Sequence, residues 1–127
     1  MNIKYTADHV FHVEETYLER NIALQELIEA VPEAERSDIF TYNAEAEYYL
    51  ETDTLPNYKF FTLQSSMSRV DESINEQWNE EFLKREPKWV VWNVGKVCSN
   101  GQLMEWLDED YELRGQYWTY WLYERAE

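Results

Sequence analysis

The clearest strand signal in this sequence is a continuous apolar run, Lys88-Trp89-Val90-Val91-Trp92-Asn93-Val94. Its apolar residues do not alternate cleanly with polar ones, which is typical of a central strand covered on both faces. Two further runs also read as strands: Asp38-Ile39-Phe40-Thr41-Tyr42 and Tyr58-Lys59-Phe60-Phe61-Thr62-Leu63. Because helical stretches separate the three runs, the sequence predicts βαβ units and a mostly parallel sheet.

Apolar residues at helical spacing precede and follow these strands. The repeating positions are Leu24, Leu27, Ile28 and Val31 in the first stretch, Ile74, Trp78 and Phe82 in the second, and Leu103, Trp106 and Leu107 in the third. Pro32 ends the first stretch, and Ser99 with Gln102 forms a capping box that opens the last one. Asn43 can cap a short helix over Ala44 to Glu51, whereas Gln64 to Arg69 is expected to be a loop.

The chain closes with an aromatic hairpin, in which Tyr111 to Arg114 and Tyr117 to Tyr123 flank a turn at Gly115-Gln116. The expected fold class is therefore α/β, as a three-layer Rossmann-like sheet that is mostly parallel and carries a C-terminal antiparallel hairpin. We expect residues 1–127 to form a single α/β domain. The mixed composition of residues 1–13 is compatible with either an arm or an edge strand.

The charge of the chain excludes several classes of ligand. There are 26 acidic and 11 basic residues, which gives a net charge of −15. Such a chain repels nucleic-acid phosphates, so no nucleic-acid partner is expected.

Cys98 is the only cysteine, which rules out an internal disulfide. The sequence shows neither the roughly 20 consecutive apolar residues of a membrane span nor a secretory leader at its start.

Neither a metal nor an organic cofactor is predicted. His9 and His12 are three residues apart, but no third ligand has complementary spacing. The segment from Cys98 to Gly101 follows a strand and opens a helix without the glycine pattern of a phosphate loop. A nucleophilic pair of Cys98 with a histidine stays open on spacing alone, although no orienting group accompanies it. The many paired carboxylates are interpreted as solvated helix faces, so we predict no catalytic residues.

Ligand contacts are expected at the loops that follow the strands, because open α/β sheets bind ligands there. The two loops are Gln64 to Arg69 and Val94 to Gly101, and the exposed rings of the Tyr117–Tyr123 strand would add a stacking surface. The predicted contact residues are Gln64, Ser65, Ser66, Cys98, Ser99, Asn100, Trp118, Tyr120 and Trp121.

The order of these elements resembles a known family. A helix that ends in Pro32 leads to a strand at Ile39 to Tyr42, a short helix containing Tyr49-Leu50, Pro56 and the run from Tyr58. Pro87-Lys88-Trp89-Val90-Val91 and Asp110-Tyr111-Glu112-Leu113 continue the match, which covers about residues 20–124. This arrangement resembles the carboxyl-terminal soluble region of bacterial multi-spanning membrane proteins related to the protein-mannosyltransferase and aminoarabinose-transferase glycosyltransferases.

The resemblance implies location more than chemistry. In that family the catalytic acidic residue lies between membrane helices that this chain does not contain, so no catalytic residue is carried over. It implies a non-catalytic, extracytoplasmic soluble domain of a glycosyltransferase-like protein, whose partners are the membrane-embedded part of the same polypeptide or a glycan acceptor. The alternative is a stand-alone acidic interaction protein, cytoplasmic and bound to a basic partner. No oligomeric state is predicted.

Overall fold

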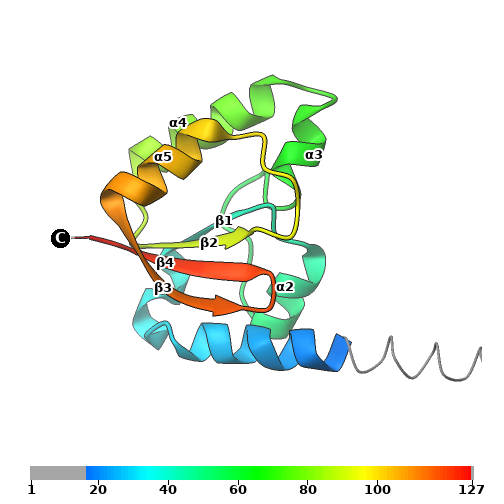
Figure 1. The fold of residues 1–127 in the computed structure, drawn as a ribbon, viewed down its shortest axis with the longest axis vertical. Coiled ribbons are helices and arrows are strands. Elements are labelled where there is room, and N and C mark those ends of the chain that lie inside the picture. The colour runs from blue at the N-terminus through cyan, green and yellow to red at the C-terminus, as the bar shows by residue number, and fades with distance from the viewer. Residues whose placement is uncertain (1–16, 127) are drawn as a thin grey trace, which may run out of the picture.

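The computed structural model describes residues 17–126, which form a four-stranded mixed sheet (Figure 1). The strands are β1 (Ile39–Tyr42), β2 (Trp89–Asn93), β3 (Tyr111–Tyr117) and β4 (Tyr120–Arg125). Their order in the sheet is β1-β2-β4-β3, and only β1 and β2 are parallel. The prediction of a mostly parallel Rossmann-like sheet is therefore wrong, because the hairpin pairs with β2 and supplies half of the strands.

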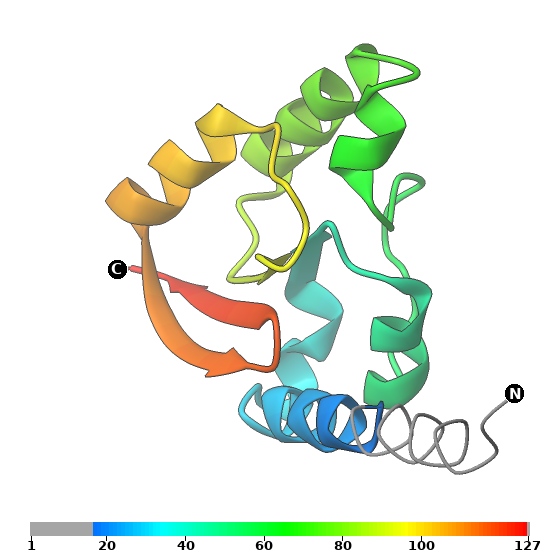
Figure 2. The same ribbon diagram turned by 45° about the vertical axis from the view of Figure 1, so that its right-hand side comes forward.

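Helices cover both faces of this sheet (Figures 1 and 2). One face carries the helix over residues 17–29 and α2 (Ala46–Thr52), and the other carries α4 (Ser73–Arg85) and α5 (Gly101–Asp110). A 3₁₀ helix, η1 (Glu33–Asp38), leads into β1, and α3 (Gln64–Ser68) precedes α4. Within residues 17–126, no helix is both long enough and apolar enough to cross a bilayer.

Apart from Trp106, which is only partly buried, the apolar positions at helical spacing bury as the sequence predicts. Leu24, Leu27, Ile28 and Val31 all lie in the core cluster on the first face. Trp78 and Phe82 on α4 pack with Leu103 and Leu107 on α5 in the cluster on the second face. Every residue of β2 except Trp92 is buried, which confirms a central strand covered on both sides.

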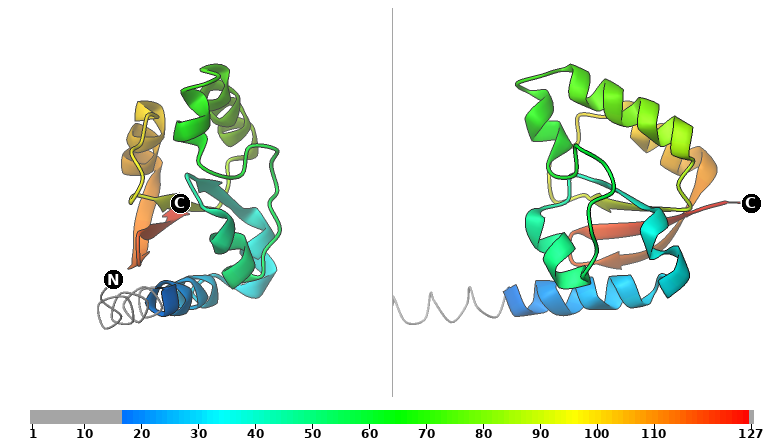
Figure 3. Two further views of the ribbon diagram at one scale, coloured as in Figure 1. Left: turned by 90° about the vertical axis from the view of Figure 1, so that its right-hand side faces the viewer. Right: turned by 180° about the vertical axis from the view of Figure 1, so that it is seen from behind.

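The predicted strand over Tyr58 to Leu63 is wrong, because this segment runs irregularly past the outer side of β1 (Figure 3). Backbone groups along the outer side of β1 are bonded by side chains rather than by the backbone of a neighbouring strand. Asn57 Nδ2 donates to Ile39 O at 2.8 Å, Trp78 Nε1 donates to Thr41 O at 3.0 Å, and Gln64 Oε1 accepts from Asn43 N at 2.6 Å. The aromatic residues of the segment pack on neighbouring rings, as in the 5.6 Å contact of Tyr58 with Phe40.

Several local predictions also need correction. Asn43 does not cap α2, which begins after Glu45 without a side-chain cap, and Asn100 rather than Ser99 caps α5. Gln64 to Ser68 forms the helix α3 rather than a loop, and the hairpin turns at Trp118-Thr119 rather than at Gly115-Gln116. Gly115 lies inside β3, at a register shift opposite β4. A Cβ atom there would come within 2.6 Å of Tyr117 Cε2, so the glycine makes room for that ring rather than for a turn.

Candidate functional site

A polar cleft of about 240 Å³ lies at the edge of the sheet where the parallel strands β1 and β2 end. Its lining comes from α3, the start of α4 and the loop after β2, in the residues Ser65, Ser68, Arg69, Glu72, Asn75, Val97 and Ser99. Both loops named by the sequence analysis therefore meet at this edge. The cleft exposes hydroxyl, amide, guanidinium and carboxylate groups together.

Asn43 directly follows β1, and Asn93 is the last residue of β2. Hydrogen bonds of these two side chains fix the segments around the cleft. Asn43 is 1% exposed and has a left-handed backbone with φ 60°, a conformation that asparagine tolerates better than most residues. Its side chain accepts from Ser65 N at 2.9 Å and donates to Val97 O at 3.4 Å. Asn93 Nδ2 in turn donates to Asn43 O at 3.2 Å. These bonds tie α3 to the loop after β2.

The hydroxyl of Ser65 uses all of its hydrogen-bonding capacity within this network. Its Oγ accepts from Asn43 Nδ2 at 3.2 Å and from Ser99 N at 3.0 Å, and it lies 2.9 Å from the hydroxyl of Tyr42. Because both lone pairs accept, the Ser65 proton is left to donate to Tyr42, which itself donates to Asn75 Oδ1 at 2.5 Å. Burial raises the pKa of Tyr42, so its hydroxyl stays protonated at neutral pH.

Ser68 differs from Ser65 because its hydroxyl has no hydrogen-bond partner among residues 17–126. The residue is only 9% exposed and lies on the wall of the cleft. A buried hydroxyl without a partner is destabilising by about 1–3 kcal/mol. The oxygen itself is covered by neighbouring atoms, so a ligand in the cleft bonds it only after the Ser68 side chain turns toward the cleft.

A second hollow, of about 150 Å³, lies on the other side of the loop after β2, at the tip of the hairpin. Trp118 lines it with 42% of its surface exposed and a left-handed backbone of φ 59°. Lys96 Nζ pairs with Glu45 Oε1 at 2.8 Å beside it, which raises the pKa of Lys96. An exposed indole next to charged and amide groups is a surface on which a sugar ring can stack.

The remaining predicted contact residues lie away from the cleft surface. Ser66 is exposed on α3 and does not line the cleft. Gln64 is fully buried against β1, and Asn100 caps α5 by accepting from Leu103 N at 3.2 Å. In β4, Tyr120 is buried and accepts from Glu45 N at 3.1 Å, whereas Trp121 packs against Trp92 with ring centroids 6.2 Å apart.

Cys98 sits at the back of this edge, half-buried between β2 and α5. Burial raises the pKa of its thiol, which keeps it protonated near neutral pH. His9 and His12 lie outside the described residues. Among the residues that the structure describes, no group of three or more His, Cys, Asp or Glu side chains is placed to hold a metal ion.

Two features of the site were missed by the sequence analysis. The first is the pair Asn43 and Asn93, which could have been found because an asparagine stands at the end of both parallel strands, each time directly after an aromatic residue. The second is the contribution of Asn75 and Glu72 from the start of α4, for which the sequence carries no local signal. Comparisons with family models, with curated proteins and with solved structures found no match.

Proposed function

We propose that this chain is a non-catalytic binding module whose polar cleft holds a small polyhydroxylated ligand, such as the terminal sugar of a glycan acceptor. The observation that carries the proposal is that Ser68, a residue of the cleft wall, has a buried hydroxyl with no hydrogen-bond partner within residues 17–126. A sugar hydroxyl is both a donor and an acceptor, so it can satisfy this group as well as the neighbouring Ser99 and Asn75.

The charges at the cleft favour a neutral ligand over an anion. Arg69 and Glu72 are both exposed and both line the cleft, so one cation and one anion face the same space. The net charge of −15 adds a long-range repulsion against anions. A neutral polyol can bond to the donors and acceptors of the cleft without repulsion from Glu72 or from the net negative charge. The indole of Trp118 in the adjacent hollow offers a stacking surface to a second sugar unit.

The hydrogen bonds around the cleft support binding rather than catalysis. Nucleophilic catalysis needs a side chain activated by a neighbouring base. The proton of Ser65 is directed at Tyr42, and the thiol of Cys98 has a raised pKa. Neither group is arranged as an activated nucleophile.

The location of the module rests on the family resemblance of residues 20–124. We propose an extracytoplasmic domain beside a membrane-embedded, glycosyltransferase-like half of the same polypeptide, where the cleft would contact the acceptor. Sequencing the surrounding reading frame tests this location. A frame that continues upstream into several apolar helices would support it, and a frame without them would refute it.

Replacing Ser68 by alanine is expected to weaken sugar binding about tenfold while raising the free energy of unfolding by about 1–3 kcal/mol. The reason is that the substitution removes a hydroxyl that is unpartnered in the free protein and bonded in the complex. Binding is measured by NMR, following the amide signals of residues 64–69 and 94–100 during titration with methyl mannoside, N-acetylglucosamine and glucuronate.

Ser66→Ala is the matched control, since it makes the same substitution on an exposed position of the same helix. It should bind like the parent protein. Glucuronate is the anionic comparison, so the proposal fails if neither neutral sugar shifts the signals of either segment, if glucuronate binds more tightly than both, or if Ser66→Ala weakens binding as much as Ser68→Ala.

A further inference from the structure

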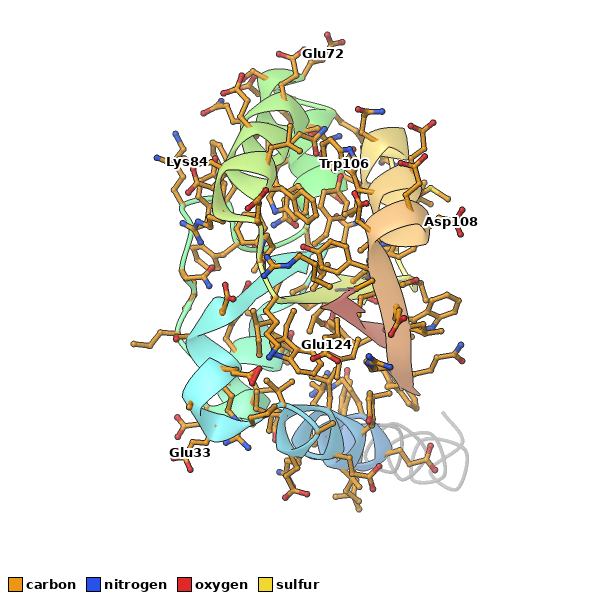
Figure 4. The ribbon with its side chains drawn as sticks, turned by 90° about the vertical axis from the view of Figure 1, so that its left-hand side faces the viewer. Glu33, Glu72, Lys84, Trp106, Asp108 and Glu124 are labelled. Carbon is orange, nitrogen blue, oxygen red and sulfur yellow. The ribbon has the colours of Figure 1, made fainter. Side chains whose placement is uncertain are left out.

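A groove of about 540 Å³ opens between α4 and α5, at the edge of the sheet opposite the polar cleft. The residues that line it are Phe82, Leu83, Glu86, Trp106, Glu109, Asp110, Tyr111, Arg125 and Ala126. Its volume lies within the range of ligand sites in proteins. In Figure 4, Trp106 lies between the ribbons of α4 and α5, whereas Asp108 points outward from α5.

Three aromatic rings form the wall of this groove. Phe82 and Trp106 stack with ring centroids 5.0 Å apart and planes only 5° from parallel. Tyr111 lies 5.8 Å from Phe82 with its ring tilted by 42°. Phe82 is buried and stacks on both Trp78 and Trp106, and Tyr111 is buried as well, so the partly exposed Trp106 presents most of the aromatic surface that a ligand can reach. Leu83, which is 57% exposed, extends the apolar surface.

The rim of the groove is acidic. The carboxylates of Glu86, Glu109 and Asp110 are exposed, and none of them has an ion pair among the described residues. Arg125 is the one basic residue that lines the groove, and its Nη1 donates to the main-chain oxygen of Glu86. The balance at the rim is therefore negative.

Two helices also end at this groove. Both α4 and α5 have their carboxyl termini there, where the helix dipole places partial negative charge. The last turn of α5 contains Asp108, Glu109 and Asp110 and no basic residue. Acidic side chains at this end of a helix are destabilising, because they add charge of the same sign as the helix dipole. A cation bound from outside would relieve this repulsion.

We propose that the groove binds a lysine or arginine side chain of a basic protein partner. The aliphatic stem of that side chain covers Leu83 and Trp106, and its charged head meets Glu109 and Asp110. A long basic side chain matches both the apolar wall and the acidic rim, which neither an apolar nor an anionic ligand does. This inference does not depend on the sugar ligand, because the two sites share no residue.

The test is an NMR titration of the whole chain with a short peptide of alternating glycine and lysine. We expect a saturable shift of the Trp106 indole Nε1–H signal and of the amide signals of residues 109–111. The double variant Glu109→Gln/Asp110→Asn should bind the peptide about tenfold more weakly. It should also melt at a higher temperature, because it removes acidic charge from the end of α5. Weaker binding by a more stable protein cannot be attributed to unfolding.

The matched control, Glu26→Gln/Glu29→Gln, removes the same charge from exposed positions of the helix over residues 17–29. It should change the affinity less than about twofold, because salt screens charges at that distance. Three results would overturn the proposal: no shift of the Trp106 signal, equal weakening by the control variant, or equal binding of a peptide of alternating glycine and glutamate.

Discussion

Replacing Trp78 by alanine is expected to lower the free energy of unfolding by about 3–5 kcal/mol. Trp78 is fully buried between α4 and the sheet, with its ring centroid 4.7 Å from that of Phe40 and 5.4 Å from that of Phe82. The substitution leaves a cavity among these rings. It also removes the Nε1–H donor that bonds Thr41 O at 3.0 Å, so a carbonyl of β1 loses a partner.

Urea unfolding followed by circular dichroism measures this loss. Trp118→Ala serves as the control, since it removes the same side chain from an exposed position and should change the free energy of unfolding by only about 0.5 kcal/mol. A loss below about 1 kcal/mol for Trp78→Ala would mean that α4 does not pack on the sheet as the structure shows.

Raising the pH from about 10 to about 12 is expected to unfold the protein through its buried tyrosines. Burial raises the pKa of both Tyr49 and Tyr120 to about 12. In the unfolded chain a tyrosine ionises near pH 10, so between these values the folded state binds more protons than the unfolded state. Stability is therefore complete below pH 10 and falls as the pH rises, by about 2–3 kcal/mol for each of the two tyrosines.

Tyr48→Phe sharpens this test. Burial also raises the pKa of Tyr48, whose hydroxyl has no hydrogen-bond partner among the described residues. The phenylalanine variant should unfold at a higher pH, as followed by tyrosinate absorbance together with circular dichroism. Tyr17→Phe, at a position that is 53% exposed, should leave the transition where it is. An alkaline transition that Tyr48→Phe does not move would contradict the role of buried phenols.

The sequence predicts the positions of β1 and β2 and the buried faces of the helices well. Those signals are local, since apolar residues such as Leu24 and Trp78 recur at a helical period whatever the topology. Sheet order is not local. The hairpin pairs with β2 because Tyr120 to Glu124 aligns with Asn93 to Trp89, and no pattern in either segment alone reports that pairing.

The segment from Tyr58 to Leu63 shows why the topology was mispredicted. It has the aromatic and β-branched composition of a strand, but its rings pack against side chains while Asn57 and Gln64 bind β1. Composition cannot distinguish these two uses of the same residues. Three strand-like runs therefore predict three parallel strands, although only two of the runs form strands.

The candidate site was predicted in part. The two loops do meet at the carboxyl ends of β1 and β2, as the rule for open sheets with parallel strands suggests. Which groups point into the cleft depends on the phase of α3. Ser65 and Ser68 are three residues apart and share its buried face, whereas Ser66 faces solvent. The polar composition of the segment predicts a loop, and a loop has no helical phase from which these directions could be read.

The side chains along the outer side of β1 also bear on aggregation. An edge strand with free backbone groups is a template on which another chain can add a strand. Part of that template is occupied, because Ile39 O and Thr41 O of β1, and Asn43 N directly after it, are bonded to side chains of the same chain. The opposite edge, β3, carries the charged residues Glu112 and Arg114 and a register shift, which also disfavour strand addition. Both edges of the sheet therefore carry features that disfavour growth into cross-β fibrils.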